Sequence, residues 1–309
     1  MQIYLPIAEM SVNILLILGM GAAVGFLSGL FGVGGGFILT PLLIFSGIPP
    51  VVAVASTANQ IIAASVSGVI AHWRRKQVDF KMGGVLIGGG IAGTGLGIWI
   101  FDYLETVGQS DLVISLSYVV LLGTIGGLML YESVGVILRA PRGTPNPTPK
   151  TGQHLWIHRL PFRMRFRRSR LYISVIGPVV LGFLVGLMTT IMGVGGGFVL
   201  VPVMIYLLQM PTSVVIGTSL FQIIFVTSAA TLLHALSTKS VDVVLSMLLA
   251  VGGVIGAQAG ARFGLRLSGE QLRAMLAIVV LLIGIRMAYG LTVRPDQVFS
   301  LTTISVGEP

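Results

Sequence analysis

The sequence predicts an all-α polytopic membrane protein, built from two inverted homologous halves. Three observations predict this class: 54% of the 309 residues are hydrophobic, only 9% are charged, and long apolar runs recur along the chain, giving a mean hydropathy of +0.97. A soluble globular protein carries about a quarter charged residues, and a helix needs roughly 20 apolar residues to cross a bilayer. The composition therefore argues against a water-soluble enzyme.

The apolar runs give each half about four long spans. In the first half they cover residues 11–30, 51–72, 82–101 and 112–131, and a comparable set follows Tyr172. We expect the run at 11–30 to be a retained span, because the preceding residues include Glu9 but no Lys or Arg and so lack the basic start of a signal peptide. The 42 glycines fit this class, since small residues let membrane helices pack closely.

An internal repeat divides the chain. The motif Gly32-Val-Gly-Gly-Gly-Phe37 recurs as Gly193-Val-Gly-Gly-Gly-Phe198, an offset of 161 residues (193 − 32). Further identities follow at offsets of 161 to 163, among them Pro41 with Pro202, Gln60 with Gln222, His72 with His234, Asp79 with Asp242, and Gly89, Gly93 and Gly97 with Gly252, Gly256 and Gly260. The repeat predicts two transmembrane halves, residues 1–138 and 172–309, joined by a linker at 139–171.

The linker is strongly basic and predicts the orientation of the chain. It contains nine of the nineteen basic residues and no acid: Arg139, Arg142, Lys150, Arg159, Arg163, Arg165, Arg167, Arg168 and Arg170. Because Lys and Arg next to spans favour the cytoplasm, we expect a protein of the bacterial inner membrane with this loop in the cytoplasm. Arginines interleaved with aromatic residues favour anionic lipid as the partner of the linker over nucleic acid or another protein.

The charges of the other loops predict that the halves are inverted. In the first half, the loop after the span 51–72 carries Arg74, Arg75 and Lys76. In the second half, the basic residues lie instead in the next loop between spans, from Arg262 onward. Inversion needs an odd number of crossings per half, so a fifth must come from the short segments 35–46 and 197–208. Each segment begins at a triple glycine and is too short for an ordinary span, which predicts a Gly-broken half-helix.

The glycine motifs are the first candidate binding elements. A helix that starts at a glycine turn presents free N–H groups and a partial positive charge, which attract anions. Two such ends that meet near mid-membrane could hold an oxyanion between the repeats. The alternative is that the glycines only allow a tight helix crossing. The substrate-binding candidates here are Gly34, Gly35, Gly36, Gly195, Gly196 and Gly197.

The spans that follow the half-helices carry polar residues where polarity is costly. Amides and hydroxyls can donate hydrogen bonds to an anion without adding a charge that traps it. They can equally join helices to each other. These candidates are Ser56, Thr57, Asn59 and Gln60 in the first half and Thr218, Ser219 and Gln222 in the second.

Two histidines and one arginine are candidates for gating or proton transfer. His72 and His234 are related by the repeat and end their spans, where they could gate, carry protons or simply cap the helix at the interface. Arg262 reaches the inner surface and could draw anions toward a cytoplasmic mouth.

The sequence lacks the residues that several kinds of chemistry require. The chain has no cysteine, which removes disulfides, iron–sulfur clusters and thiolate zinc sites. No carboxylate lies deep in an expected span, and Gly32–Gly36 lacks the Lys-Ser/Thr of a phosphate loop. We therefore expect no cofactor, no metal and no enzymatic or ATP-driven activity of the chain itself.

The duplicated glycine motifs with Pro41 and Pro202, together with His72, Val78-Asp79-Phe80 and Gly93-Thr-Gly-Leu-Gly97, resemble the sulfite exporter TauE/SafE family, also called the toluene sulfonate uptake permease group. The resemblance covers roughly residues 14 to 290 and implies secondary transport, usually outward, of sulfite, thiosulfate or organosulfonates. The two inverted halves favour alternating access around a midplane site as the mechanism. The chain departs from the family in its longer basic loop and in the polar run Ala55-Ser-Thr-Ala-Asn-Gln60. An anion channel, a transporter of another small organic anion, a membrane scaffold and a homo-oligomer stay open.

Overall fold

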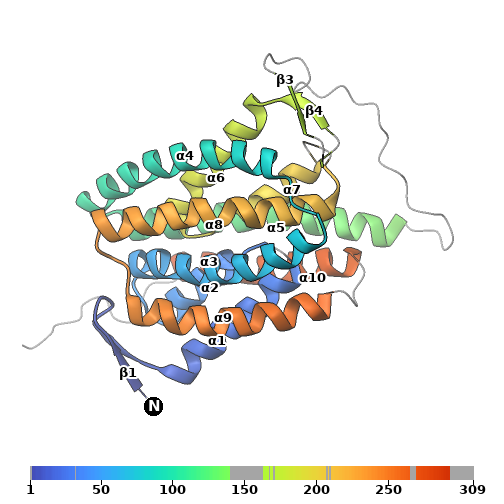
Figure 1. The fold of residues 1–309 in the computed structure, drawn as a ribbon. Coiled ribbons are helices and arrows are strands. Elements are labelled where there is room, and N and C mark those ends of the chain that lie inside the picture. Colours follow the sequence, from blue (N-terminus) through green and yellow to red (C-terminus); the bar gives the residue numbers. More distant parts are fainter. Residues whose placement is uncertain are drawn as a thin grey trace, which may run out of the picture.

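The computed structural model describes residues 2–31, 33–139, 163–166, 168–169, 171–206, 208, 210–264 and 269–292. Helices dominate these ranges (Figure 1). The first half contains α1 (Ile14–Phe31), α2 (Gly36–Phe45), α3 (Pro50–Arg74), α4 (Phe80–Thr106) and α5 (Ser110–Arg139). The second contains α6 (Ile176–Met192), α7 (Gly197–Tyr206), α8 (Thr212–Ser237), α9 (Val243–Gly264) and α10 (Gly269–Thr292).

Seven of these helices, namely α1, α3, α4, α5, α8, α9 and α10, are long and apolar enough to cross a membrane. The described chain is therefore an all-α polytopic membrane protein, as the composition predicts. The remaining apolar helices are shorter: α6 has 17 residues, and α2 and α7 have 10 each. One boundary differs from prediction, since the span expected at 11–30 begins as a helix only at Ile14.

Close glycine contacts give the relative direction of the helices. Gly21, Gly25 and Gly29 of α1 lie, in that order, against Leu249, Gly253 and Ala257 of α9, so these two helices are parallel. The same holds for α4 and α6, where Gly89, Gly93 and Gly97 lie against Val179, Phe183 and Thr190. In contrast, α3 and α8 are antiparallel, because Gly68 lies against Leu220 and Gly217 against His72.

The helices group into two bundles that exchange a helix between the halves (Figure 1). One bundle contains α1, α3 and α9, and the other contains α4, α6 and α8. The antiparallel pair α3 and α8 joins the bundles, and α5 packs against α10. Each bundle therefore borrows its third helix from the opposite half.

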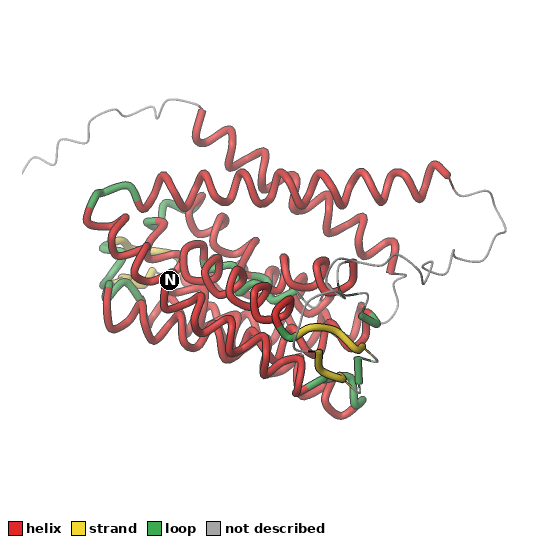
Figure 2. The backbone as a smooth tube through the Cα atoms, turned by 90° about the horizontal axis from the view of Figure 1, so that it is seen from above, coloured by secondary structure: helices red, strands yellow, loops and turns green. Residues whose placement is uncertain are grey.

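A β-hairpin precedes the first helix of each half, and the two hairpins lie at opposite ends of the bundle (Figures 1 and 2). Strands β1 (Gln2–Leu5) and β2 (Met10–Asn13) form one, and β3 (Arg163–Phe166) and β4 (Leu171–Ser174) form the other. Corresponding strands are offset by 161 residues (163 − 2 and 171 − 10). Strand β3 falls inside the expected linker 139–171, whose residues 140–162 lie outside the described ranges.

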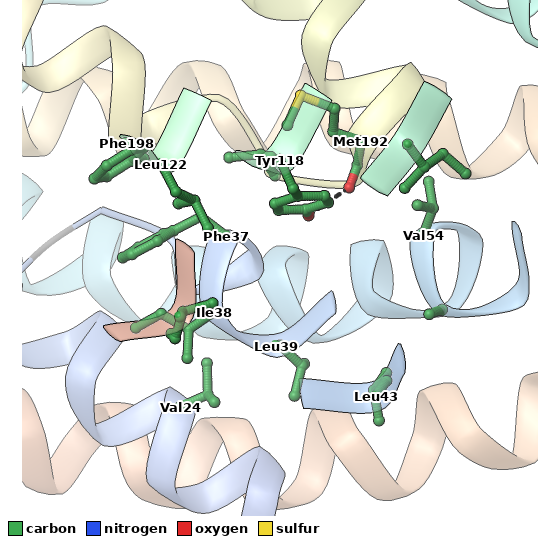
Figure 3. Close-up of a cluster of buried hydrophobic side chains, with 14 of the residues drawn as sticks. Val24, Phe37, Ile38, Leu39, Leu43, Val54, Tyr118, Leu122, Met192 and Phe198 are labelled. Carbon is green, nitrogen blue, oxygen red and sulfur yellow. Dashed lines mark hydrogen bonds between the residues drawn. The ribbon is translucent and has the colours of Figure 1, made fainter. Parts of the chain in front are cut away.

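The centre of the core lies where the two half-helices begin (Figure 3). The repeat-related rings of Phe37 and Phe198 stack there with centroids 4.4 Å apart. Beside them, the buried hydroxyl of Tyr118 donates a 2.6 Å hydrogen bond to the carbonyl oxygen of Met192, which ends α6. Aromatic stacking and this hydrogen bond fix the two halves against each other at mid-depth.

Candidate functional site

The two glycine motifs form turns that pack against each other. Left-handed backbone angles at Gly34 (φ 91°), Gly35 (φ 65°) and Gly195 (φ 73°) favour glycine at these positions. A side chain at Gly36 would bring its Cβ to 2.6 Å from the carbonyl oxygen of Gly193, and one at Gly197 would collide with the carbonyl of Val33. In this conformation the opposite turn therefore covers the start of each half-helix.

Part of the hydrogen-bonding capacity of the first turn is already used. The N–H of Gly36 donates to the carbonyl of Gly34 over 2.8 Å, and the N–H groups of Ile38 and Leu39 donate to the carbonyl of Gly35. The turns thus provide the tight crossing that the sequence left as an alternative. The described contacts bring Gly36 and Gly197 close to backbone oxygens of the opposite turn.

Gln60 and Gln222 are fully buried and their amides have no hydrogen-bond partner among the described residues. Each is the eleventh residue of its helix, α3 or α8 (60 − 50 + 1 and 222 − 212 + 1), about 15 Å from the helix start and thus near the middle of the helix. A buried polar group without a partner costs about 1–3 kcal/mol. The two glutamines are therefore the described residues with the most unused hydrogen-bonding capacity, and both remain candidates for contact with a polar ligand.

The two amides point to equivalent places in the two bundles. A Cβ placed on Gly253 of α9 would lie 2.6 Å from Nε2 of Gln60, and one on Gly90 of α4 would lie 3.2 Å from Nε2 of Gln222. Gly90 and Gly253 are themselves related by the repeat (253 − 90 = 163). The amides do not bond to each other, and each lies against a glycine of the opposite half.

Two further hydroxyls share the condition of the glutamines and were not singled out in the sequence. Ser65 in α3 and Thr227 in α8 are fully buried, and their hydroxyl oxygens have no partner among the described residues. They are related by the same offset as the glutamines (227 − 65 = 222 − 60 = 162). Among the described residues, all six unpaired buried side-chain atoms thus come from two repeat-related pairs, and the repeat offset that relates them is visible in the sequence.

Most of the other polar candidates are bonded within the protein. Ser56 accepts a 3.0 Å hydrogen bond from the N–H of Asp242, and Thr218 accepts an equivalent 3.0 Å bond from the N–H of Asp79. Thr57 bonds within its own helix and to Thr40, and Ser219 donates to the carbonyl of Ile216. Asn59 is partly exposed. The hydroxyls of Ser56, Thr57 and Thr218 therefore connect different elements, whereas that of Ser219 bonds within its own helix.

Asp79 and Asp242 connect the hairpins to the bundles. Asp79 Oδ2 accepts hydrogen bonds from the N–H (3.0 Å) and hydroxyl (2.7 Å) of Ser169, just after β3. Asp242 Oδ2 accepts one from the N–H of Ile7, in the turn of the other hairpin (3.0 Å). Each hairpin is therefore held by an aspartate of the opposite half, which the sequence alone did not predict.

The two histidines have different surroundings. His72 is partly exposed, lies 2.9 Å through Nδ1 from Oε1 of Gln77, and lines a cavity at the end of α3. His234 is buried: its Nε2 donates to the carbonyl of Thr190 over 2.9 Å, and the edge of its ring meets Phe101. One end of the molecule is therefore open at the histidine, and the equivalent place at the other end is closed.

The same cavity, of about 450 Å³, contains Arg262 on its wall. Its remaining charged residues are Arg74 and Arg75, which lie at the turn between α3 and α4. Arg168 and Ser169 contact this turn through the Val78 carbonyl and Asp79, so the cavity opens on the side of the basic linker.

The fold is that of a multi-pass membrane protein, and comparison with known proteins assigns the family. The family described as sulfite exporter TauE/SafE matches residues 17–287, and the chain belongs to it. The probable membrane transporter protein YjnA of Bacillus subtilis (strain 168) is 34% identical over 278 residues, which cover 90% of this chain and all of that protein.

Two other relatives extend over similar lengths. The probable membrane transporter protein YunE of Bacillus subtilis (strain 168) is 27% identical over 91% of this chain and 98% of its own. A probable membrane transporter protein of Xylella fastidiosa (strain 9a5c) is 29% identical over 88% of this chain and 94% of its own. No solved structure matches the chain. The family and these relatives make the protein a membrane transporter and not an enzyme.

Proposed function

We propose that the protein is a secondary transporter that exports small sulfur-containing anions, such as sulfite, thiosulfate or organosulfonates, by alternating access around mid-membrane. The observation that carries this proposal is the duplicated set of unpaired buried groups, Gln60 with Ser65 and Gln222 with Thr227. The family description, which names sulfite, supports the substrate class.

The chemistry of these groups suits an oxyanion. Amide N–H and hydroxyl groups donate hydrogen bonds to sulfonate or sulfite oxygens and leave the site uncharged, so that a bound anion can also leave. Ile61 and Ile223, the residues after the two glutamines, pack against the glycine turns: Cγ2 of Ile61 and Cδ1 of Ile223 would lie 3.7 and 3.5 Å from a Cβ on Gly34. Isoleucines from both helices that carry the amides therefore pack against the first glycine turn.

The directions of the helices support an inverted arrangement of the halves. In one direction run α1, α3 and α9, and in the other α4, α6 and α8, so that equivalent helices oppose each other. Inverted halves allow two states that exchange the environments of the repeats. The open surroundings of His72 and the closed surroundings of His234 are the asymmetry expected of one such state.

The orientation follows from the positive-inside rule. We propose that the open end, the basic linker and the turn with Arg74–Lys76 face the cytoplasm of a bacterial cell, and that the linker lies on anionic lipid. An exporter open to the cytoplasm would stand ready to load its substrate.

The test is counterflow in proteoliposomes that contain the purified protein. Labelled sulfite, thiosulfate or sulfoacetate outside is expected to accumulate transiently when the same unlabelled anion fills the lumen, and Gln60→Ala/Gln222→Ala is expected to abolish this accumulation. Gln109→Ala changes an exposed glutamine between α4 and α5 and is the matched control, with unaltered transport.

Each result separates the alternatives. Saturable counterflow supports a carrier, whereas flux that neither saturates nor counterflows identifies an anion channel. Counterflow that persists in a folded double variant refutes the glutamine site. Counterflow of carboxylates without any sulfur anion identifies a transporter of other organic anions.

A further inference from the structure

The cavity at the linker side extends from the surface toward Gln60, one of the two buried glutamines. Its exposed lining lies at the ends of α3 and α9, with Arg74, Arg75 and Arg262, and its buried lining includes Ser28 and Ala64, each only 5% exposed. Exposed residues mark the mouth and buried ones the floor. The cavity thus runs from a cationic mouth to a buried floor in which Ser28 supplies a hydroxyl.

The floor lies one helical turn from the candidate substrate site. Ala64 is four residues from Gln60 along α3, and Ala257, also in the lining, is four residues from Gly253, the neighbour of Gln60. Four residues of α-helix rise about 6 Å. A ligand on this floor would therefore be one turn away from the unpaired amide of Gln60.

The charges at the mouth are not balanced within the described chain. None of the guanidinium groups of Arg74, Arg75 and Arg262 has a hydrogen-bond or ion-pair partner among the described residues, and the cavity lining contains no acid. Like charges gathered at a cleft with low-dielectric walls focus the field and raise the local concentration of counter-ions. The mouth is therefore an attractor of anions.

The opposite end of the molecule lacks these charges. The residues that the repeat relates to Arg74 and Arg75 are Leu236 and Ser237 (offset 162), and the one related to Arg262 is Trp99 (262 − 163). The positive mouth is therefore not a by-product of the repeat. It distinguishes the linker side of the transporter from the other side.

The size and apolar wall of the cavity indicate the class of ligand. A volume of about 450 Å³ falls within the range of small-molecule sites, which starts near 300 Å³, and is far larger than a bare sulfite ion. Ile70, Ile216 and Leu220 supply apolar surface beside the arginines. This combination fits an organic anion with a short carbon body better than an inorganic one.

We propose that this cavity is a capture site for a small organic anion bearing a sulfonate or carboxylate group, which Arg74, Arg75 and Arg262 hold before it passes to Gln60. The proposal rests on the proposed transport function and adds a second station, a direction and a preference for organosulfonates. An anionic lipid headgroup offers the same oxygens and is the other source of ligand that the experiment must separate.

The experiment compares Arg74→Gln/Arg262→Gln with Arg286→Gln, whose arginine lies instead against Phe45 and Tyr289. Full-length protein is placed in vesicles of phosphatidylcholine and, separately, in vesicles that also contain an anionic phospholipid, and initial rates of labelled sulfoacetate and sulfite transport are measured from the linker side. The double variant is expected to raise KM for sulfoacetate on the order of tenfold at low salt, with Vmax unchanged, and the difference should shrink at high salt. Arg286→Gln should match the wild type.

A binding measurement keeps the capture site separate from the deep site. Equilibrium dialysis with sulfoacetate is carried out on Gln60→Ala/Gln222→Ala, with and without Arg74→Gln/Arg262→Gln. Weak, salt-sensitive binding that only the arginine changes remove supports the capture site even if transport of these anions fails. Equal binding or equal KM with and without the arginines overturns it. An effect of the arginines seen only in vesicles with anionic lipid assigns them to headgroups and also overturns it.

Discussion

At the scale of single residues, the functional signal is a set of polar groups that the fold leaves unpaired. The side chains of Gln60, Ser65, Gln222 and Thr227 are buried and have no partner among the described residues. The neighbouring Ser56 and Thr218 are bonded to the turns of Asp242 and Asp79. Buried polar groups in native proteins are nearly always hydrogen-bonded. Under the proposed function, these exceptions are the residues that would contact the ligand, whereas the bonded hydroxyls hold the structure.

Gly253→Ala tests directly whether the Gln60 amide contacts the transported anion. The three heavy atoms nearest to an added Cβ all belong to the Gln60 side chain, at 2.6 to 3.0 Å, so this flexible side chain must move. We expect a loss of anion affinity of about tenfold, since an amide hydrogen bond to a charged ligand contributes about 1.5–3 kcal/mol. Binding of the transported anion, measured by isothermal titration calorimetry, checks this.

Gly88→Ala is the matched control, because nothing lies within 4 Å of the Cβ added there. Removing glycine from an open helical position stabilises by about 0.5–1 kcal/mol. Unchanged affinity in both variants would mean that Gln60 does not contact the anion.

Ser169→Ala tests how firmly a hairpin is held. The hydroxyl of Ser169 donates a 2.7 Å bond to the buried carboxylate of Asp79, while the N–H bond to the same oxygen survives the substitution. Hydrogen bonds to charged groups contribute about 1.5–3 kcal/mol, so thermal unfolding in detergent should begin at a lower temperature. Ser11→Ala removes an exposed hydroxyl from the other hairpin and should melt like the wild type. Identical melting of all three proteins would contradict this role.

At the scale of elements, the two half-helices act as one unit because they meet end to end. Their glycine turns touch, and the rings of Phe37 and Phe198 stack at 4.4 Å with an interplanar angle of 15°. Prolines at 41 and 202 lie inside the two short helices. A proline removes one helical hydrogen bond and favours a kink. The two short helices are therefore firmly packed against each other, but each has fewer backbone hydrogen bonds than a regular helix of its length.

A double-mutant cycle measures this coupling. Phe37→Leu and Phe198→Leu should each destabilise the protein, and the double variant should cost less than the sum by about 0.5–1.5 kcal/mol, the value of an aromatic pair. Denaturant unfolding of the four proteins in micelles gives the cycle. Phe37→Leu combined with Phe101→Leu, whose ring instead meets His234, should be additive. Additivity in the first cycle would show that stacking does not join the half-helices.

At the scale of the whole molecule, the exchanged helices and opposing directions make a prediction about sidedness. Lys76 and Lys239 are related by the repeat (239 − 76 = 163) and both adopt positive φ, 58° and 51°, in the turns after α3 and α8. Because α3 and α8 are antiparallel, these turns lie at opposite ends of the bundle.

The chain has no cysteine, so a single introduced cysteine can report which side of the membrane a turn faces, and no native cysteine has to be removed first. In intact cells and in inverted vesicles, a membrane-impermeant maleimide should label Lys76→Cys only from the cytoplasmic side and Lys239→Cys only from the other. Labelling of both from one side would refute the inverted arrangement.

The sequence was sufficient to predict the elements that have a strong and repeated residue pattern. Long apolar runs predict the long helices, and the triple glycines predict short helices at 36–45 and 197–206 within a residue or two. The hairpins escaped prediction because β3 lies in a basic run and β1 lies before the first apolar span, without the alternation of a buried strand. The roles of Asp79 and Asp242 escaped because their partners are 90 and 235 residues away. Ser65 and Thr227 could have been found by extending the offset of the glutamines along the same helices.

The crosswise hold of the hairpins has a consequence for how the chain is made. The first hairpin docks through Ile7 onto Asp242, and α1 packs along α9, so neither partner exists until most of the chain has left the ribosome. The glycine face of α1 therefore has no packing partner while the seven helices α2 to α8 are synthesised. A chain truncated before residue 242 would therefore lack the partner of its first hairpin and the helix along which α1 packs.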